Sequence, residues 1–170
     1  MAQVTADALE RARRLRLMLF DVDGVLTDGR LWYGAEGEAL KAFHVLDGHG
    51  VKLLQQGGIA AGILSGRRSA AVALRAAELG VAHVLQGVED KRPAFDDLLA
   101  RLGLRAAEAG YMGDDLPDLP VLAHCGLACA PRGAHAEVRR GAHYVADAEG
   151  GRGAVREVCD YVLRAQGRQP

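Results

Sequence analysis

The chain has 170 residues, a length that buries about two thirds of the unfolded surface and supplies one hydrophobic core rather than two. Its 21 basic and 22 acidic residues give a net charge of −1, so no overall positive field attracts nucleic acid or an anionic membrane surface. The three cysteines, Cys125, Cys129 and Cys159, form no C-x-x-C pair, which argues against a disulfide framework or a zinc site and favours free thiols in a reducing cytosol.

The beginning of the chain carries no recognisable export or membrane signal. Residues 1–14 mix charged side chains with alanines, and the apolar run Leu15–Phe20 is too short for a signal-peptide core or a membrane span. This run is instead typical of a buried parallel strand that stops at Asp21. Ligands of open α/β sheets bind at such carboxyl ends of strands.

Short apolar runs and segments of helical periodicity alternate along the rest of the chain. The further expected strands are Ile59–Leu64, Val81–Leu85, Ala109–Met112, Gly126–Ala130 and His143–Ala146. The expected helices are Asp47–Gln56, Ser69–Leu79, Lys91–Leu102, Leu116–His124 and Val155–Ala165. This alternation predicts an α/β fold with a single doubly wound parallel sheet, in one domain over residues 1–170.

The segment after the first strand breaks the alternation. Arg30–Tyr33 and Glu38–Phe43 are typical of two strands around the turn Gly34–Gly37, which predicts a β-hairpin flap over about residues 29–44. A chain of this length has no room for a separate cap domain, so other parts of the molecule must shield a site at the sheet edge.

The residues behind the first strand have the composition of an acidic metal site. Asp21 and Asp23 alternate in the run Asp21–Asp28, and neighbouring carboxylates raise each other's pKa unless a cation compensates. Mg²⁺ supplies that charge and prefers oxygen ligands. Asp21 could then attack phosphorus as a nucleophile, with Asp23 as general acid and base. The structural alternative is an Asx turn that ends the strand.

A second acidic loop, Gly113–Asp118, follows the expected strand Ala109–Met112. Two acidic loops at one sheet edge can form a metal-binding site, in which Asp114 is the natural direct ligand. Asp115 or Asp118 would orient waters or neighbouring groups, and Asp118 could equally cap the helix that follows.

Ser65 and Lys91 are the candidate phosphate ligands. Ser65 lies between an expected strand and helix, where a hydroxyl and free backbone N–H groups bind phosphate oxygens, although serine is also a common helix cap. Lys91 stands at a helix start, where its ammonium could neutralise Asp21 and the transferred phosphoryl group; the alternative is a solvated surface lysine.

Along the chain these groups come in the order Asp21, Ser65, Lys91 and the acidic loop Gly113–Asp118, each at an expected strand end or helix start. With this order the sequence resembles the haloacid dehalogenase superfamily of phosphatases, and within it the 3-deoxy-D-manno-octulosonate 8-phosphate phosphatase family. The resemblance covers nearly everything from Leu15 to Gly167. Its most specific stretches are Asp21–Gly29, Lys41–Phe43, Gly113–Asp115 and Gly150–Asp160. It implies a cytoplasmic enzyme of lipopolysaccharide precursor synthesis that releases phosphate from an eight-carbon sugar acid through an aspartyl phosphate.

The resemblance also implies the roles of individual residues. Mg²⁺ would be held by Asp21, the backbone carbonyl of Asp23, and Asp114, while Ser65 and Lys91 would bind the phosphate. The residues that would meet the sugar acid or its phosphate are Asp23, the loop residues His44, Val45, Leu46, Asp47 and Gly48, and the cations Lys52, Arg67, Arg75 and Lys91. A plain helix-surface charge is the alternative for Arg75.

Two positions of this substrate loop depart from the commonest family pattern. Leu46 stands where arginine is frequent, and Lys52 also differs. Because leucine cannot donate a hydrogen bond to a carboxylate, either Lys52 and Arg67 do more of that work or the preferred sugar differs. A nine-carbon, sialic-acid-type 9-phosphate is therefore the rival substrate.

Family members are tetramers in which the hairpins form a central barrel and a C-terminal tail, here about residues 150–170, reaches a neighbour's active site. Leu31, Trp32 and Tyr33 fit such an interface, with packing under the flap as the alternative. Arg152 could approach a neighbouring site or lie in a plain loop. Two alternatives to this hydrolase function are a non-catalytic oligomeric scaffold, against which the intact acids argue, and phosphoryl transfer to an acceptor other than water.

Overall fold

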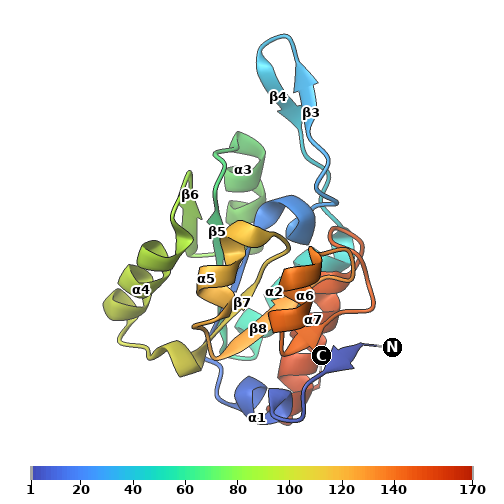
Figure 1. Ribbon diagram of the computed structural model, residues 1–170. Coiled ribbons are helices and arrows are strands. Elements are labelled where there is room, and N and C mark those ends of the chain that lie inside the picture. Colours follow the sequence, from blue (N-terminus) through green and yellow to red (C-terminus); the bar gives the residue numbers. More distant parts are fainter. Residues whose placement is uncertain (1, 170) are drawn as a thin grey trace.

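A seven-stranded sheet forms the centre of the computed structural model, which describes residues 2–169 (Figure 1). Its strand order is β1-β9-β8-β7-β2-β5-β6. The strands are β1 (Gln3–Val4), β2 (Leu17–Phe20), β5 (Ala60–Ser65), β6 (His83–Gln86), β7 (Ala109–Met112), β8 (Leu127–Ala130) and β9 (Tyr144–Val145). All neighbours pair in parallel except β1, which runs antiparallel to β9. The α/β prediction is confirmed, and β1 is an antiparallel edge strand that it lacked.

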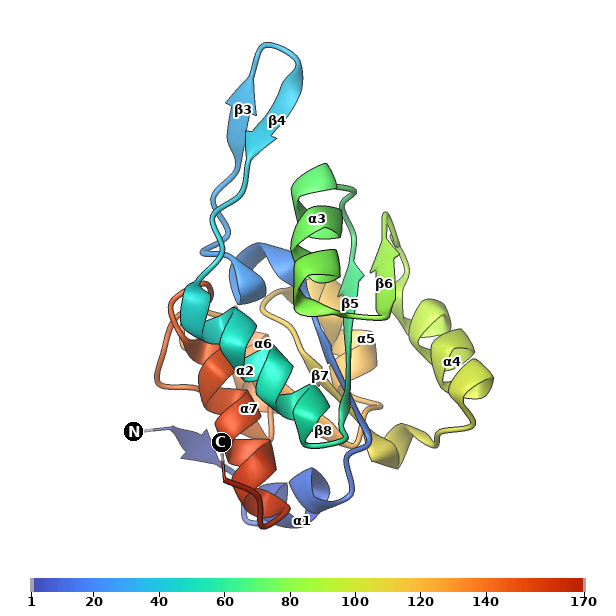
Figure 2. The ribbon, with the colours of Figure 1, turned by 180° about the vertical axis from the view of Figure 1, so that it is seen from behind.

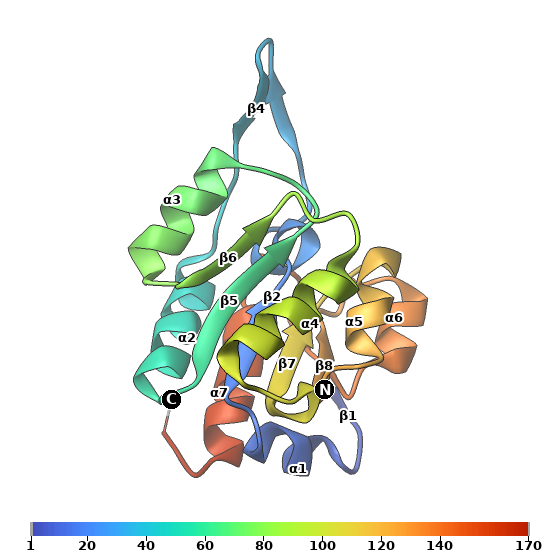
Figure 3. The same ribbon diagram turned by 90° about the vertical axis from the view of Figure 1, so that its left-hand side faces the viewer.

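Helices cover both faces of the sheet (Figures 2 and 3). On one face pack α1 (Ala8–Arg13), α2 (Val45–Gln56), α3 (Ala70–Leu79) and α7 (Ala154–Ala165). On the other pack α4 (Lys91–Leu102), α5 (Leu119–Leu122) and α6 (Ala136–Gly141). This arrangement gives two buried apolar clusters with the sheet between them.

The strand β2 shows how the sequence pattern produces these two layers. Met18 and Phe20 belong to the cluster beneath α2 and α7, whereas Leu17 and Leu19 belong to the cluster beneath α4. Successive side chains of a strand point to opposite faces, so a strand buried on both faces must be apolar throughout. All four residues are at most 1% exposed.

The hairpin projects from the top of the molecule in Figure 1. Its strands, β3 (Trp32–Gly34) and β4 (Gly37–Leu40), form a separate two-stranded sheet around the turn at Ala35 and Glu36. It follows an irregular helical turn, η1 (Val22–Leu26), in which Gly24 has a φ of 85°. The predicted flap is therefore present.

Two predicted elements differ from the structure. The helix expected over Asp47–Gln56 begins two residues earlier, at Val45 with His44 as its N-cap, so the expected substrate loop His44–Gly48 is helical from Val45 onward. The long helix expected over 116–124 is a 3₁₀ turn, η3 (Leu116–Asp118), followed by the four-residue α5, since Pro117 and Pro120 lack the N–H donors of a continuous helix. A second 3₁₀ turn, η2 (Ala106–Glu108), leads into β7. Within residues 2–169, no helix is both long and apolar enough to cross a membrane.

Candidate active site

Three parallel strands bring the predicted catalytic residues to one edge of the sheet. Phe20 of β2 pairs with Ile63 of β5 on one side and with Met112 of β7 on the other. Asp21 therefore follows β2 next to the carboxyl ends of both neighbours, where Ser65 ends β5 and Asp114 follows β7. The side chain of Asp21 also accepts a hydrogen bond from the backbone N–H of Val22 at 2.7 Å.

Lys91, the first residue of α4, reaches the same place. It is 5% exposed, and its Nζ lies 2.9 Å from Asp21 Oδ2 and 2.6 Å from Asp118 Oδ1. Burial disfavours the ammonium, but the two carboxylates outweigh it and raise the pKa of Lys91. Lys91 is thus a charged residue of the site rather than a solvated surface lysine.

Asp118 connects Lys91 with the loop that carries Asp114. One of its oxygens accepts hydrogen bonds from Lys91 and from the hydroxyl of Tyr111, both at 2.6 Å. The other accepts from the backbone N–H groups of Asp114 at 2.9 Å and Asp115 at 3.1 Å. The same buried side chain therefore orients the ammonium and fixes the loop that carries Asp114.

The carboxylates present a donor set suited to a divalent cation. One oxygen each of Asp21, Asp114 and Asp118 lies within 4.8 Å of the other two. Burial and the neighbouring acids raise the pKa of Asp114 to about 7, and burial raises that of Asp21 to about 6 despite the opposing charge of Lys91. A cation would relieve this repulsion, and clustered carboxylate oxygens are what Mg²⁺ prefers. Each oxygen of Asp118 already accepts two hydrogen bonds, whereas each oxygen of Asp21 meets one donor, so Asp21 and Asp114 fit best as direct ligands.

The backbone of η1 approaches these ligands closely. A Cβ added at Gly24 would lie 2.0 Å from Asp114 Oδ2, and the φ of 85° is itself unfavourable for other residues. Gly24 thus lets the segment that carries Asp23 pass directly beside Asp114. This proximity supports the predicted use of the Asp23 carbonyl as a metal ligand.

A hollow in front of Asp21 is lined by most of the predicted phosphate and metal ligands. Its lining includes Asp21, Asp23, Ser65, Gly66, Arg67, Lys91 and Asp114. Of the substrate residues predicted by resemblance, Asp23, Arg67 and Lys91 belong to it. The others, His44, Val45, Leu46, Asp47, Gly48, Lys52 and Arg75, lie outside this lining, so their contacts with substrate stay predictions.

Several of these outlying residues have contacts of their own. The carboxylate of Asp47 is buried and accepts hydrogen bonds from the backbone N–H groups of Gly153 and Arg156 at the start of α7. Arg75 forms an ion pair with Glu78 at 2.8 Å and passes over Gly48, where an added Cβ would lie 2.2 Å from its guanidinium. Val45 and Leu46 are exposed at the surface.

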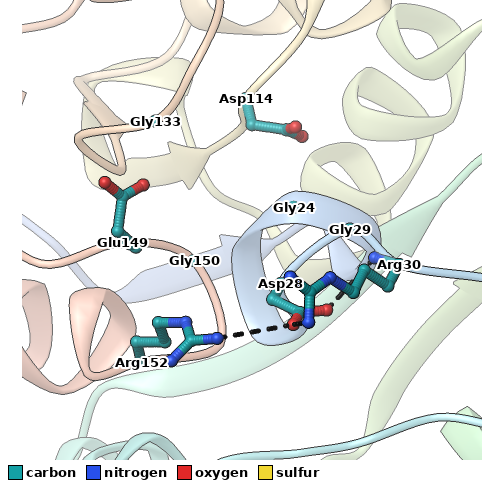
Figure 4. A pocket seen from close by; sticks show the side chains of 9 residues that line it. All are labelled: Gly24, Asp28, Gly29, Arg30, Asp114, Gly133, Glu149, Gly150 and Arg152. Carbon is teal, nitrogen blue, oxygen red and sulfur yellow. Dashed lines mark hydrogen bonds and ion pairs between the residues drawn. The ribbon is translucent and has the colours of Figure 1, made fainter.

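A second hollow adjoins the first at Gly29 and Asp114 (Figure 4). Arg30 and Arg152 lie on its rim, and each approaches the carboxylate of Asp28, at 3.7 and 3.8 Å. The lining of this hollow also includes the carboxylates of Asp114 and Glu149, so it contains groups of both charges. Arg152 therefore borders a hollow of its own subunit, a position that the sequence did not indicate.

Three contributors to the site were not singled out from the sequence: Tyr111, Glu38 and Lys41. In the sequence Tyr111 is simply one residue of an expected buried strand, yet its hydroxyl donates to Asp118 and accepts from Lys91 at 3.1 Å. Lys41 belongs to the stretch Lys41–Phe43, which resembles the family but indicates no role for the lysine. Its side chain forms an ion pair with Asp23, although 18 residues separate the two in the sequence.

Known proteins with similar sequences place this site in a family. No protein-family model matches the chain. The 3-deoxy-D-manno-octulosonate 8-phosphate phosphatase KdsC of Yersinia pestis is 47% identical over 163 residues, which cover 96% of this chain and 87% of the relative. The chain belongs to the 3-deoxy-D-manno-octulosonate 8-phosphate phosphatase family.

Solved structures agree with this membership. The 3-deoxy-D-manno-octulosonate 8-phosphate phosphatase of Moraxella catarrhalis, solved with magnesium ion, phosphate ion and KDO, superposes with a TM-score of 0.93 at 40% identity, covering 96% of this chain and 94% of that one. An HAD superfamily (subfamily III A) hydrolase of Legionella pneumophila has a TM-score of 0.92 at 44% identity, covering 95% and 88%. The phosphatase family and its superfamily, expected from the sequence, are thereby confirmed.

Proposed function

We propose that this protein is a Mg²⁺-dependent phosphatase that hydrolyses 3-deoxy-D-manno-octulosonate 8-phosphate to the free sugar acid and phosphate. The observation that carries the proposal is the convergence of Asp21, Lys91 and Asp114 around one hollow, with Ser65 at its edge. Family membership supplies the substrate class.

The residues that would hold Mg²⁺ are Asp21, Asp114 and the backbone carbonyl of Asp23. When bound, the ion would neutralise the carboxylates and the phosphoryl oxygens, so that an anionic nucleophile can approach an anionic ester. Asp118 would hold the Asp114 loop in place through the two backbone N–H groups that it accepts from.

The chemistry of the chain's own groups follows from their positions. A carboxylate oxygen of Asp21 attacks phosphorus, and the bond to the sugar oxygen breaks while Asp23 gives that oxygen its proton. Water then attacks phosphorus and passes a proton to Asp23. The bond between phosphorus and the Asp21 oxygen breaks, and this releases phosphate and restores the Asp21 carboxylate. Ser65 and Lys91 hold the phosphoryl oxygens through both steps, and the ammonium stabilises the charge that develops on them.

Assembly and location form part of the proposal. The hairpin leaves Leu31, Trp32, Tyr33 and Leu40 between 42% and 61% exposed, which suits an interface between subunits. We infer a homotetramer that associates through the hairpins, in the cytoplasm, where the sugar phosphate would be made. The partners are thus the sugar phosphate and further copies of the chain, with no role for nucleic acid or membrane.

The test is phosphate release from the eight-carbon 8-phosphate and from a sialic-acid-type 9-phosphate, with and without Mg²⁺. We expect strong preference for the first ester and loss of turnover on chelation. Preference for the nine-carbon ester would retain the chemistry and replace the substrate. Hydrolysis of neither ester would contradict the phosphatase assignment and revive a scaffold role.

A further inference from the structure

A buried lysine, Lys41, lies against Asp23 directly after the second strand of the hairpin. The side chain of Lys41 is 1% exposed, and its Nζ lies 2.5 Å from Asp23 Oδ1 and 3.1 Å from Glu38 Oε2. A lysine is almost never this buried unless its charge is paired. Its two carboxylate partners explain why it can be held there.

Glu38 connects this lysine to the body of the molecule. Its carboxylate accepts a hydrogen bond from the hydroxyl of Ser69, the N-cap residue of α3, at 2.5 Å. Burial opposes the charge of Glu38, but hydrogen bonds from Ser69 and Lys41 outweigh it and lower its pKa. The ion pair of Lys41 is therefore anchored on the scaffold as well as on the hairpin.

The other cation beside Asp23 is held less firmly. Arg67 Nε lies 3.5 Å from Asp23 Oδ2, and the Arg67 side chain is 43% exposed. Its guanidinium also donates to the hydroxyl of Tyr33 at 2.6 Å. Because an exposed ion pair is weak and a buried, hydrogen-bonded one is not, Lys41 is the partner that fixes the Asp23 side chain.

We propose that Lys41 is a positioning residue, which holds the Asp23 carboxyl group over the phosphate hollow and thereby makes proton transfer to the sugar oxygen depend on a correctly docked hairpin. This inference rests on the proposed function, because Asp23 must act as the general acid. Lys41 itself lies outside the lining of the hollow and acts only through Asp23.

The test uses two esters that differ in their need for an acid. The sugar alkoxide must receive a proton as its bond to phosphorus breaks, whereas the phenolate of p-nitrophenyl phosphate leaves without one. The ratio kcat/KM reports the steps up to transfer of the phosphoryl group to Asp21. Misplacing the acid should cost about 100-fold on the sugar ester and less than about tenfold on the aryl ester.

We expect Lys41→Met to show this split and Asp23→Asn to show the same pattern. Lys41→Arg retains the cation and should keep the ratio of the two kcat/KM values near that of the wild type. Glu36→Gln changes a charge at the exposed turn of the same hairpin and should leave both esters unaffected.

Two outcomes would overturn the inference, and they differ in what else they overturn. If the wild type hydrolyses the sugar ester and Lys41→Met loses both esters by one common factor, Lys41 is structural and only this inference fails. If the wild type leaves the sugar ester intact in Mg²⁺, the proposed function fails and the inference falls with it.

Discussion

Asp118 is the residue on which most of the site's order depends. It is 1% exposed and accepts hydrogen bonds from Lys91, Tyr111 and two backbone N–H groups. Asp118→Ala would leave these donors buried and remove one of the two carboxylates that neutralise Lys91. We expect the free energy of unfolding to fall by about 3–5 kcal/mol, as for other broken buried ion pairs, measured by urea denaturation.

The control for this prediction is Asp97→Ala, which removes an exposed carboxylate of α4 and should change stability by about 0.5 kcal/mol or less. Equal losses in the two variants would mean that the Asp118 network contributes nothing. Activity should fall only in Asp118→Ala.

The raised carboxyl pKa values predict how metal-free stability depends on pH. Burial raises the pKa of Asp21 from 3.8 to about 6, and burial with neighbouring acids raises that of Asp114 to about 7. The folded protein therefore binds these protons more tightly than the unfolded chain. Their contribution is fully present below about pH 4 and is lost as the pH rises through about 7.

The melting temperature of metal-free protein should accordingly fall between about pH 5 and about pH 7.5, and Mg²⁺ should raise it more at the higher pH. Asp114→Asn removes one of the two groups and should flatten the profile. A metal-free melting temperature that climbs across this window would contradict the account.

At this scale the sequence predicted the acids and Lys91 because they follow strand ends or begin a helix. It did not predict Lys41, Glu38 or Tyr111, because the contacts that join them to the rest of the site, with Asp23, Ser69 and Asp118 respectively, span 7 or more residues. No periodicity encodes a contact between the hairpin and the sheet edge. Tyr111 looks in the sequence like any other apolar residue of a buried strand.

Among the elements, α7 begins in an unusual way. Its N-cap residue is Gly153, which has no side chain to accept the free N–H groups of the first turn. Asp47 of α2 supplies that acceptor from another element, bonding Gly153 N–H at 3.2 Å and Arg156 N–H at 2.9 Å. The contact ties the helix after the hairpin to the C-terminal helix.

Removing this cap should be measurable. Asp47→Ala should lower the free energy of unfolding by about 1–2 kcal/mol and leave KM for the sugar ester unchanged. The comparison of urea denaturation with steady-state kinetics also tests the predicted substrate contact of Asp47. A raised KM at unchanged stability would favour that contact over the capping role.

At the scale of elements, strong apolar patterns were sufficient to predict a helix or strand and its bounds, whereas very short elements could not be predicted. The helix Lys91–Leu102 and the strand Ala109–Met112 match their predicted bounds. The edge strand β1 has two residues and α6 has six, both too short for a period to show. The loop expected over His44–Gly48 is helical from Val45, where α2 begins with four residues between it and the end of β4.

For the whole molecule, the parallel sheet explains why distant residues meet, and the hairpin explains why the protein should associate. Trp32→Asp would place a charge in the exposed apolar patch of the hairpin. We expect light scattering to show a tetramer for the wild type and smaller species for the variant. Leu9→Asp, on α1 at the opposite end of the molecule in Figure 1, is the control and should remain tetrameric.

A wild type that is monomeric, or a Trp32→Asp variant of unchanged mass, would contradict association through the hairpins. The sequence alone could not establish this assembly, because an apolar hairpin packed on its own subunit has the same composition as one packed on a neighbour.

The central claim is that Asp21 carries the phosphoryl group between the two steps. The direct measurement is mass spectrometry of acid-quenched Asp23→Asn protein after mixing with p-nitrophenyl phosphate and Mg²⁺, since this ester needs no acid to react whereas the hydrolysis step needs the missing base. The account predicts one added phosphoryl group on Asp21, absent in the double variant with Asp21→Asn. A phosphoryl group on any other residue, or phosphate release without a labelled protein, would contradict it.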